Sequence, residues 1–156
     1  MGWYLLAALV LVLDQVSKLI ALRELEYAVA EHVFFWFDFT LHFNRGAAFS
    51  FLSSAGGWQR WLFTVLAFIV SAVLAIWLRR VARDQWPLAL GLSLVLGGAL
   101  GNLIDRMRLG YVVDFISVHY QTWYFPTFNV ADAAISVGAA FIIYDSFKNP
   151  ADSSGR

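Results

Sequence analysis

Two aspartates, Asp114 and Asp132, stand in apolar surroundings where a charged side chain is costly. Asp114 interrupts the apolar run of residues 110–116, and Asp132 lies where a hydrophobic segment begins, within residues 128–135. Ionisable groups within or beside membrane-spanning segments are functional candidates, because they usually face the protein interior or a water-filled cavity. Two carboxylates that lie together can share one proton and activate a water molecule, which is the chemistry of aspartic proteases. That chemistry requires the rest of the chain to bring the two side chains together.

Each aspartate can also be considered on its own. In Asn129-Val-Ala-Asp132 the asparagine suits a helix N-cap and the acid suits the first turn, beside the positive end of the helix dipole. Asp114 has no comparable local explanation among its apolar neighbours. Burial or a nearby carboxylate would raise its pKa, and a close pair would titrate as a unit. Capping and catalysis do not exclude each other, so both remain open for Asp132.

The composition indicates an integral membrane protein. Of 156 residues, 60% are hydrophobic and only 14% are charged, whereas a soluble domain of this length carries far more charge. The formal net charge of zero gives no reason to expect a nucleic-acid partner. The absence of cysteine excludes disulfides, thiolate metal sites and cysteine nucleophiles. The three histidines, His32, His42 and His119, lack metal-ligand spacing, so we expect neither a metal nor another cofactor.

Four hydrophobic segments are long enough to cross a bilayer. Residues 61–78 and 86–104 contain no charge, and the shorter run would extend about 27 Å as a helix. The other two candidates, residues 3–22 and 130–147, carry acidic side chains. The first segment lacks a preceding basic region and a clear cleavage site, so we interpret it as a retained anchor. We therefore expect a mainly α integral membrane protein with four transmembrane helices, and a single membrane-embedded domain over residues 1–156.

The basic residues predict the orientation of the spans. The short loop between the second and third spans carries Arg79, Arg80 and Arg83, and such loops face the cytoplasm. The polar tail of residues 149–156, with Arg156 and the preceding Lys148, agrees with this orientation. Five arginines fall on the opposite side and nearly balance the count, but residues close to span ends in short loops carry the most weight. Those five are Arg23, Arg45, Arg60, Arg106 and Arg108. Both termini are thus expected in the cytoplasm, with the two long loops facing outward.

The two long loops are expected to form a small extracytoplasmic β platform at the membrane surface. Residues 37–43 alternate apolar and polar side chains, which is the period of a strand with one buried face. Residues 123–128 are rich in aromatic side chains that favour the membrane interface. These aromatics either only set the depth of the protein in the bilayer or help to hold a lipid-bearing substrate, and the sequence leaves both open.

Other polar residues supply further candidates, each with a structural alternative. Asp14 and Lys18 are four residues apart and can form a structural ion pair, with Lys18 reaching outward, which is favoured over a chemical role. Asn44 and Gly46 lie in turn-like sequence. Gly46 would also let a substrate backbone approach closely, and Asn44 could hydrogen-bond a peptide.

The end of the third span combines small and polar residues. Gly97 and Gly101 form a Gly-x-x-x-Gly motif, which by itself indicates close helix packing. Asn102 and Arg106 follow one turn apart on one helix face. Arg106 is either an interfacial anchor or a ligand of a substrate carbonyl or lipid ester.

Five motifs follow one another along the chain. They are Leu13-Asp-Gln-Val-Ser-Lys18, Asn44-Arg-Gly-Ala-Ala-Phe49, Gly98-Ala-Leu-Gly-Asn-Leu-Ile-Asp-Arg106, Val112-Val-Asp-Phe115 and Phe128-Asn-Val-Ala-Asp132. Their types and order resemble the bacterial lipoprotein signal peptidase family, signal peptidase II. The resemblance extends over residues 13–143.

This resemblance implies an intramembrane aspartic endopeptidase of the bacterial inner membrane. Such enzymes remove the signal peptide of a prolipoprotein just before the cysteine that carries diacylglycerol. The implied catalytic pair is Asp114 and Asp132, at the outer face of the membrane, with no cofactor. The supporting positions of the family match Asn44, Asn102, Arg106, Asn129 and Asp14. The expected partners are diacylglyceryl-modified prolipoproteins and membrane lipids, and a monomer is expected.

Two other functions are compatible with buried carboxylates. A small proton-coupled transporter would use them as a relay, but relays need ionisable groups at successive depths, and only Asp14 lies deeper. A membrane scaffold without enzymatic activity would tolerate replacement of both aspartates. The enzyme is therefore the favoured prediction.

Overall fold

The computed structural model of the chain describes residues 2–45, 58–82 and 84–149. The predicted substrate contact Gly46, the loop residue Arg83 and the tail beyond residue 149 lie outside the described residues. Four helices and a small sheet follow in the order α1 (Gly2–Glu24), β1 (Ala30–Phe34), β2 (Phe37–Asn44), α2 (Trp58–Arg80), α3 (Trp86–Arg108), β3 (Val112–Tyr120), β4 (Trp123–Tyr124) and α4 (Val130–Lys148). The expected mainly α fold with a small antiparallel sheet is confirmed.

All four helices are long and apolar enough to cross a membrane. Their ends differ from the four predicted segments by at most a few residues. The largest difference is at the end of α3, which continues to Arg108. Arg106 and Arg108 occupy its last turn, where basic side chains interact favourably with the negative end of the helix dipole. The helix therefore continues past Asp105 and Arg106, the charged residues at which the predicted apolar segment stopped.

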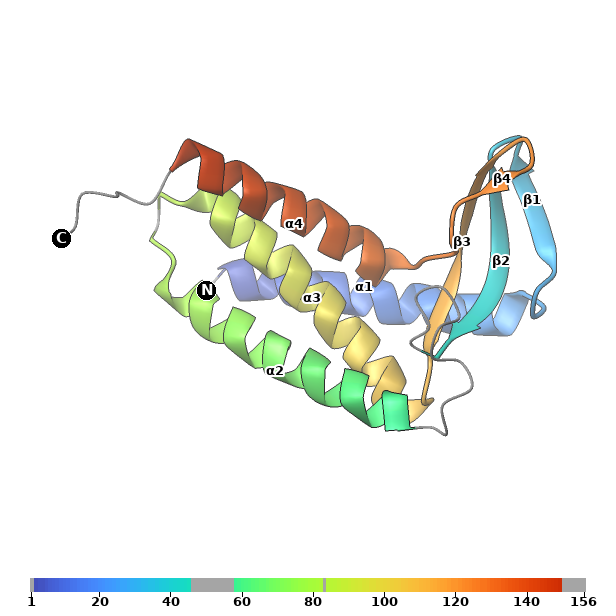
Figure 1. Cartoon of the computed structure of the whole chain (residues 1–156), viewed down its shortest axis with the longest axis horizontal. Coiled ribbons are helices and arrows are strands. Elements are labelled where there is room, and N and C mark those ends of the chain that lie inside the picture. Colours follow the sequence, from blue (N-terminus) through green and yellow to red (C-terminus); the bar gives the residue numbers. More distant parts are fainter. Residues whose placement is uncertain (1, 46–57, 83, 150–156) are drawn as a thin grey trace.

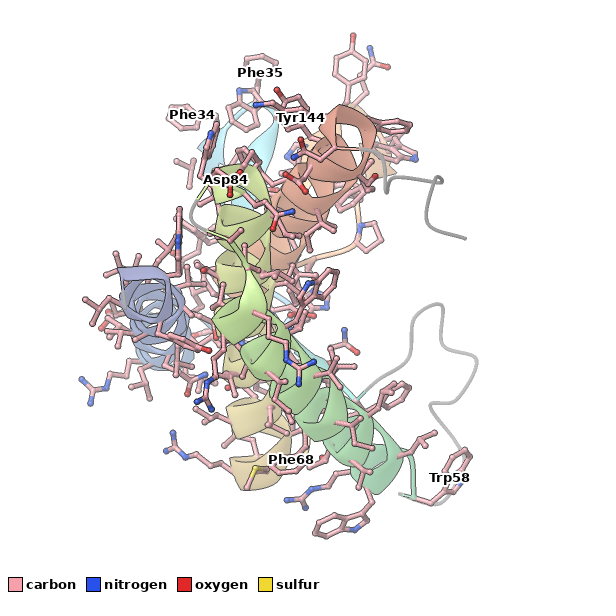
Figure 2. The ribbon with its side chains drawn as sticks, turned by 90° about the vertical axis from the view of Figure 1, so that its left-hand side faces the viewer. Phe34, Phe35, Trp58, Phe68, Asp84 and Tyr144 are labelled. Atoms are coloured by element: carbon pink, nitrogen blue, oxygen red, sulfur yellow. The ribbon has the colours of Figure 1, made fainter. Side chains whose placement is uncertain are left out.

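Helix α3 is the central helix of the bundle. It packs against α1, α2 and α4, and Figure 1 shows it between α2 and α4. The buried core between α1, α2 and α3 consists of Ala7, Leu74, Leu78, Leu88, Ala89, Leu92 and Leu96. The outward faces of the other helices keep large apolar side chains exposed, as at Phe68 and Tyr144, and Trp58 at the start of α2 points away from the bundle (Figure 2). This distribution suits helices surrounded by lipid.

Small residues let α3 approach its neighbours closely. A Cβ on Gly97 would meet the backbone of Ala7 in α1, and one on Gly98 would meet the backbone of Ala131 in α4. A Cβ on Gly101 would meet the carboxylate of Asp14. The Gly-x-x-x-Gly motif therefore acts in close packing, as its spacing indicated.

Replacing Gly98 by alanine should destabilise the protein. The added Cβ would lie 2.5 Å from the carbonyl oxygen of Ala131 and 2.8 Å from Ile135 Cγ1, and overpacking of this kind costs about 1–3 kcal/mol. Thermal unfolding in detergent measures the loss. Gly2→Ala is the control, because a Cβ there meets nothing within 4 Å. Equal unfolding temperatures for the two variants would contradict the predicted close packing.

The four-stranded sheet lies at one end of the bundle, where α1 and α3 end and α4 begins (Figure 1). The strand order is β1-β2-β3-β4 and all pairs are antiparallel. The start of α1 and the end of α4 lie at the opposite end of the bundle (Figure 1). One end of the bundle thus carries the sheet and the polar residues noted in the sequence.

Strand β2 forms where the alternating pattern predicted it, and Leu41 is buried as expected, but two polar side chains are buried as well. Asp38 and Thr40 are buried, whereas Phe37 and Phe39 are only partly buried. Both carboxylate oxygens of Asp38 lie near a histidine, His32 on β1 and His119 on β3, but only the contact with His32 has hydrogen-bond geometry. The alternation predicted a strand with two unlike faces, and the assignment of the buried face to the aromatics was wrong for these residues.

Candidate active site

Asp114 and Asp132 come from different elements that meet below the sheet. Asp114 lies on β3, following Val112 and Val113, and all three are buried. Asp132 lies in the first turn of α4 and is partly buried. The connection between β3 and α4 returns along β3, where Ile116 and Phe128 form an antiparallel bridge. This return places the start of α4 beside Asp114.

Asn129 joins the two aspartates. Its Nδ2 donates a hydrogen bond to Asp114 Oδ1 at 2.6 Å, and its Oδ1 accepts one from the backbone N–H of Asp132 at 2.9 Å. The second bond is the predicted N-cap of α4. Asn129 is fully buried, so both contacts are shielded from water. One side chain therefore caps the helix and also holds the carboxylate on the neighbouring strand.

Asn102 on α3 holds the other carboxylate. Its Nδ2 donates to Asp132 Oδ1 at 2.8 Å, and its Oδ1 accepts from Lys18 Nζ at 2.8 Å. The positive charge of Lys18 orients the amide, so that its N–H group points at Asp132. The structure thus brings Asn102, Asn129 and both aspartates into one hydrogen-bonded group.

The environment of Asp114 favours a bound proton. Burial, followed by the negative charge of Asp132, raises the pKa of Asp114 from the ordinary 3.8 to about 7. Hydrogen bonds from Asn44 and Asn129 and the charge of Lys18 oppose this rise. Near neutral pH the group can therefore carry or release a proton, as general acid–base catalysis requires.

A buried ionic cluster supports the site from below. Lys18 Nζ lies 2.9 Å from Asp14 Oδ2 and 2.8 Å from Asp105 Oδ2, and all three side chains are almost completely buried. The predicted pair of Asp14 and Lys18 is confirmed, but Lys18 points into the bundle and does not reach outward. The reason is Asp105, a second carboxylate that provides a charged partner inside the protein.

The two acids of this cluster also hold the backbone next to Asp114 and Asp132. Asp14 Oδ1 accepts a hydrogen bond from the N–H of Ala131 at 2.9 Å, and Asp105 Oδ2 accepts one from the N–H of Val113 at 3.2 Å. Ala131 and Val113 precede the two aspartates directly. Asp14 thus contacts the start of α4 through its backbone, and within the described residues it forms no hydrogen bond with either Asp114 or Asp132.

Sequence reasoning gave Asp105 and Gln15 no specific role. Gln15 Nε2 donates to Asp105 Oδ1 at 2.9 Å and to the carbonyl of Gly101 at 3.2 Å. The available signal was helical spacing, because Asn102 and Asp105 are three apart and face the same side of α3. The partner on α1 depends on tertiary packing and could not be read from that spacing.

Arg106 and Asn44 lie beside the two aspartates. Arg106 is partly buried, its guanidinium lies over the Phe63 ring at 5.8 Å, and its charge interacts with Asp132, Asp105 and Asp114. Asn44 ends β2 opposite Val112 and hydrogen-bonds Asp114. Both predicted supporting residues therefore lie at the site.

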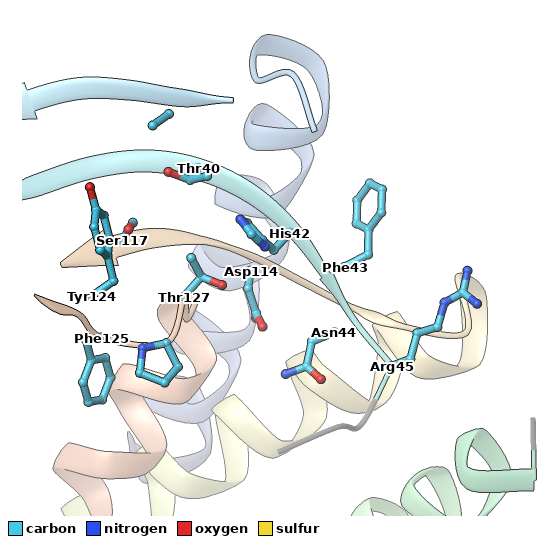
Figure 3. Close-up of a pocket in the computed structure, with 12 residues that line it drawn as sticks. Thr40, His42, Phe43, Asn44, Arg45, Asp114, Ser117, Tyr124, Phe125 and Thr127 are labelled. Carbon is cyan, nitrogen blue, oxygen red and sulfur yellow. The ribbon is translucent and has the colours of Figure 1, made fainter. Parts of the chain in front are cut away.

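A pocket of about 710 Å³ opens in front of Asp114. Figure 3 shows Asp114 and Asn44 directed into the same space, with His42 beside them on β2. The lining residues are Ala30, Thr40, His42, Phe43, Asn44, Arg45, Asp114, Ser117, Tyr124, Phe125, Pro126 and Thr127. Part of the aromatic segment expected at the interface thus lines the pocket. A peptide in this pocket would meet a carboxyl group, amides and aromatic rings.

Comparison with known proteins gives one consistent result. The family model of signal peptidase (SPase) II matches residues 6–148. A lipoprotein signal peptidase of Pseudomonas fluorescens strain Pf-5 is 55% identical over 151 residues, which cover 96% of this chain and 89% of that protein. A lipoprotein signal peptidase of Cellvibrio japonicus is 52% identical over 154 residues, and the matched region covers 99% of this chain and 91% of that protein.

Solved structures agree with the sequence comparison. A bacterial membrane enzyme determined by the in meso method at 2.3 Å has a TM-score of 0.83 and 30% identity, covering 99% of this chain and 93% of that chain. A second such structure, at 1.9 Å, has a TM-score of 0.80 and 31% identity, with coverages of 97% and 94%. The arrangement of helices and sheet is therefore shared with membrane enzymes over nearly the whole chain.

Proposed function

The chain belongs to the signal peptidase II family, and on that premise we propose that Asp114 and Asp132 form its catalytic dyad. As a lipoprotein signal peptidase it is an aspartic protease that removes signal peptides from prolipoproteins. It is a multi-pass protein of the bacterial inner membrane. The proton-coupled transporter is not supported, because the family and the matched relatives are peptidases.

The main support for the proposed dyad is the bridge formed by Asn129. Its two ends hold Asp114 and the first turn of α4 that bears Asp132. A rigid amide between two acids keeps them at a fixed separation, as a shared water requires. Asn102 and Asn129 are positioning residues in this scheme.

In the proposed reaction one aspartate is ionised and the other carries a proton. Asp132 takes a proton from the attacking water, while Asp114, whose raised pKa favours the bound proton, donates to the oxygen of the scissile carbonyl. The tetrahedral intermediate then collapses as Asp132 passes the proton taken from water to the leaving amine, and Asp114 regains its proton from the hydroxyl that becomes the new carbonyl oxygen. Arg106 and Asn44 bind the substrate backbone beside the dyad. We place the substrate's residues in the pocket lined by β2, β3 and residues 124–127.

The finer identity of the substrate is also a proposal. We propose a prolipoprotein whose cysteine already carries diacylglycerol, cut on the N-terminal side of that cysteine. Exposed apolar side chains on α1, α2 and α4 support contact with membrane lipids. One chain supplies both aspartates and the two amides that hold them, so the proposed dyad needs no second subunit, and we propose a monomer. Gly46, which we propose to admit the substrate backbone, lies outside the described residues.

We propose that the sheet and the dyad face outward from the cytoplasm. Arg79 and Arg80 end α2 at the end of the bundle opposite the sheet, and short basic loops favour the cytoplasmic side. The start of α1 and the end of α4 lie at that same end (Figure 1). Both termini are then cytoplasmic.

The function is tested with the purified chain and a synthetic lipobox peptide. We expect cleavage of the diacylglyceryl-modified peptide immediately before its cysteine, mapped by mass spectrometry, and little cleavage of the same peptide without the lipid. Cleavage of both peptides at equal rates would contradict the proposed substrate class. Cleavage at another bond would contradict the proposed specificity.

The rate should depend on pH through Asp114. Below about pH 7 this group holds the proton that the proposed mechanism needs, and above it the proton is lost. We therefore expect kcat/KM to fall about tenfold per pH unit on the alkaline side, with a midpoint near 7. Initial rates with the lipidated peptide between pH 5.5 and 9 measure the profile. A flat profile up to pH 9 would contradict the role of Asp114 as the acid.

A further inference from the structure

A second group of ionisable side chains lies on the sheet, outside the dyad. His32 belongs to β1, Asp38 to β2 and His119 to β3, so three adjacent strands contribute one residue each. His32 and Asp38 are opposite each other in the β1–β2 register. Asp38 is fully buried, whereas the His32 side chain is 75% exposed. None of the three has a part in the proposed reaction.

The nitrogen and oxygen atoms of this group converge. His32 Nδ1 lies 2.7 Å from Asp38 Oδ1, and His119 Nε2 lies 3.1 Å from Asp38 Oδ2. One such atom from each residue can be chosen so that all lie within 4.8 Å of one another. Within the described residues, Asp38 Oδ2 and His119 Nε2 nevertheless have no hydrogen-bond partner of acceptable geometry. Their closeness is thus not explained by a well-formed hydrogen bond.

This lack of a partner points to a bound cation. A buried carboxylate oxygen without a partner is costly, and such a group calls for an explanation, for which an ion is one of the usual candidates. Two imidazoles and one carboxylate suit borderline metals, whereas Mg²⁺ and Ca²⁺ prefer oxygen ligands alone. Zinc bound by three side chains keeps a fourth position for water.

We propose that His32, Asp38 and His119 bind a zinc ion on the extracytoplasmic sheet. Ligands of a tetrahedral zinc lie about 2.0–2.2 Å from the metal, and hence about 3.3–3.6 Å from one another. The two short contacts, of 2.7 and 3.1 Å, are below this spacing and end on different oxygens of Asp38, whereas one ligand atom from each residue can be chosen with all three within 4.8 Å. Binding one ion therefore requires a small shift of the side chains, which the exposed ring of His32 can make.

The zinc would link the sheet to the substrate pocket. The His119 ring stacks on Tyr124, with centroids 4.8 Å apart and planes at 23°, and Tyr124 lines the pocket in front of Asp114. Fixing His119 therefore fixes one wall of the pocket. The spacing of the histidines in the sequence gave no indication of this site, because its ligands converge only when β1, β2 and β3 pair. The proposal does not depend on the proposed peptidase mechanism.

Zinc binding is measured on the full chain in detergent, purified without a polyhistidine tag. Titration with Zn²⁺ against a chromophoric chelator should give one tight site per chain. His32→Ala should weaken that site at least about tenfold, because even loss of a residue that only supports a ligand costs 10–100-fold. His32 is the preferred position, because its exposed side chain makes unfolding of the variant unexpected.

His42→Ala is the matched control, because His42 also lies on β2 but outside the group. It should retain the tight site. Zinc should raise the unfolding temperature of the wild type and of His42→Ala, but not of His32→Ala. His119→Asn, checked for folding without metal, should lose the site as well. Equal zinc affinity of the wild type and His32→Ala would overturn the proposal, as would a folded wild type that fails to bind one zinc ion per chain in the titration.

Discussion

Asp114→Asn and Asp132→Asn should each abolish cleavage of a diacylglyceryl-modified lipobox peptide. An asparagine can neither take a proton from water nor donate one to the substrate as a carboxylic acid does. Because positioned acids and bases contribute about 10²–10⁴-fold, and the mechanism uses both, we expect kcat to fall by about 10⁴-fold in either variant. The KM should change little, since Asn44 and Arg106 still bind the substrate.

The stability of the variants separates a catalytic role from a structural one. The native state raises the pKa of Asp114 from 3.8 to about 7, so between these values it binds more protons than the unfolded chain. Stability contributed by this group is therefore lost as pH rises through that window. Because asparagine does not ionise, the Asp114→Asn variant does not lose stability in this window. The unfolding temperature of this variant at pH 8 should equal or exceed that of the wild type.

Asp145→Asn is the matched control for these measurements. Asp145 is also a buried acid on α4, but it lies near the helix end opposite Asp132. Its replacement should leave the cleavage rate unchanged. Cleavage near the wild-type rate by either dyad variant would refute the assignment, and a similar loss of activity in Asp145→Asn would attribute the effect to disturbed folding.

Lys18→Met should cause the largest loss of stability of any single substitution considered. Lys18 is the shared cation between Asp14 and Asp105, and all three side chains are almost completely buried. Removing it leaves two carboxylates without their counter-charge, and breaking a buried ion pair from one side costs about 3–5 kcal/mol. Unfolding in detergent, monitored by temperature or denaturant, measures this loss.

A triple variant tests the cause of that loss. Combining Lys18→Met with Asp14→Asn and Asp105→Asn removes both uncompensated charges, and the asparagine oxygens can still accept the backbone hydrogen bonds of Ala131 and Val113. We expect most of the lost stability to return. Lys148→Met, at the exposed end of α4, should have no effect. An unchanged unfolding temperature for Lys18→Met alone would show that the buried cluster does not stabilise the fold.

The sequence was sufficient for the features that depend on short stretches of chain. The four helices follow from the length and apolarity of single segments, because each helix satisfies its own backbone hydrogen bonds. The N-cap at Asn129 follows from four consecutive residues and is confirmed. The family follows from motifs that are recognised by their residues and their order along the chain, so their positions in space are not needed.

Strand β3 could not be predicted in this way. Its first four residues, Val112 to Phe115, are all buried, so no alternation of apolar and polar side chains marks them as a strand. The strand exists because β2 and the returning segment at Phe128 pair with it on either side. Its conformation is decided by partners that lie far away in the sequence.

The chemistry of the site depends on the same long-range packing. Lys18 reaches Asn102 across 84 positions of the chain, and Asp14 holds Ala131 across 117. The raised pKa of Asp114 requires burial beneath the sheet and the nearby charge of Asp132. Residue types and motifs were therefore sufficient to propose the two acids as candidates. Only the meeting of α1, α3, β3 and α4 decides which acid holds the proton and what keeps the pair in place, because burial and charge are properties of neighbours in space.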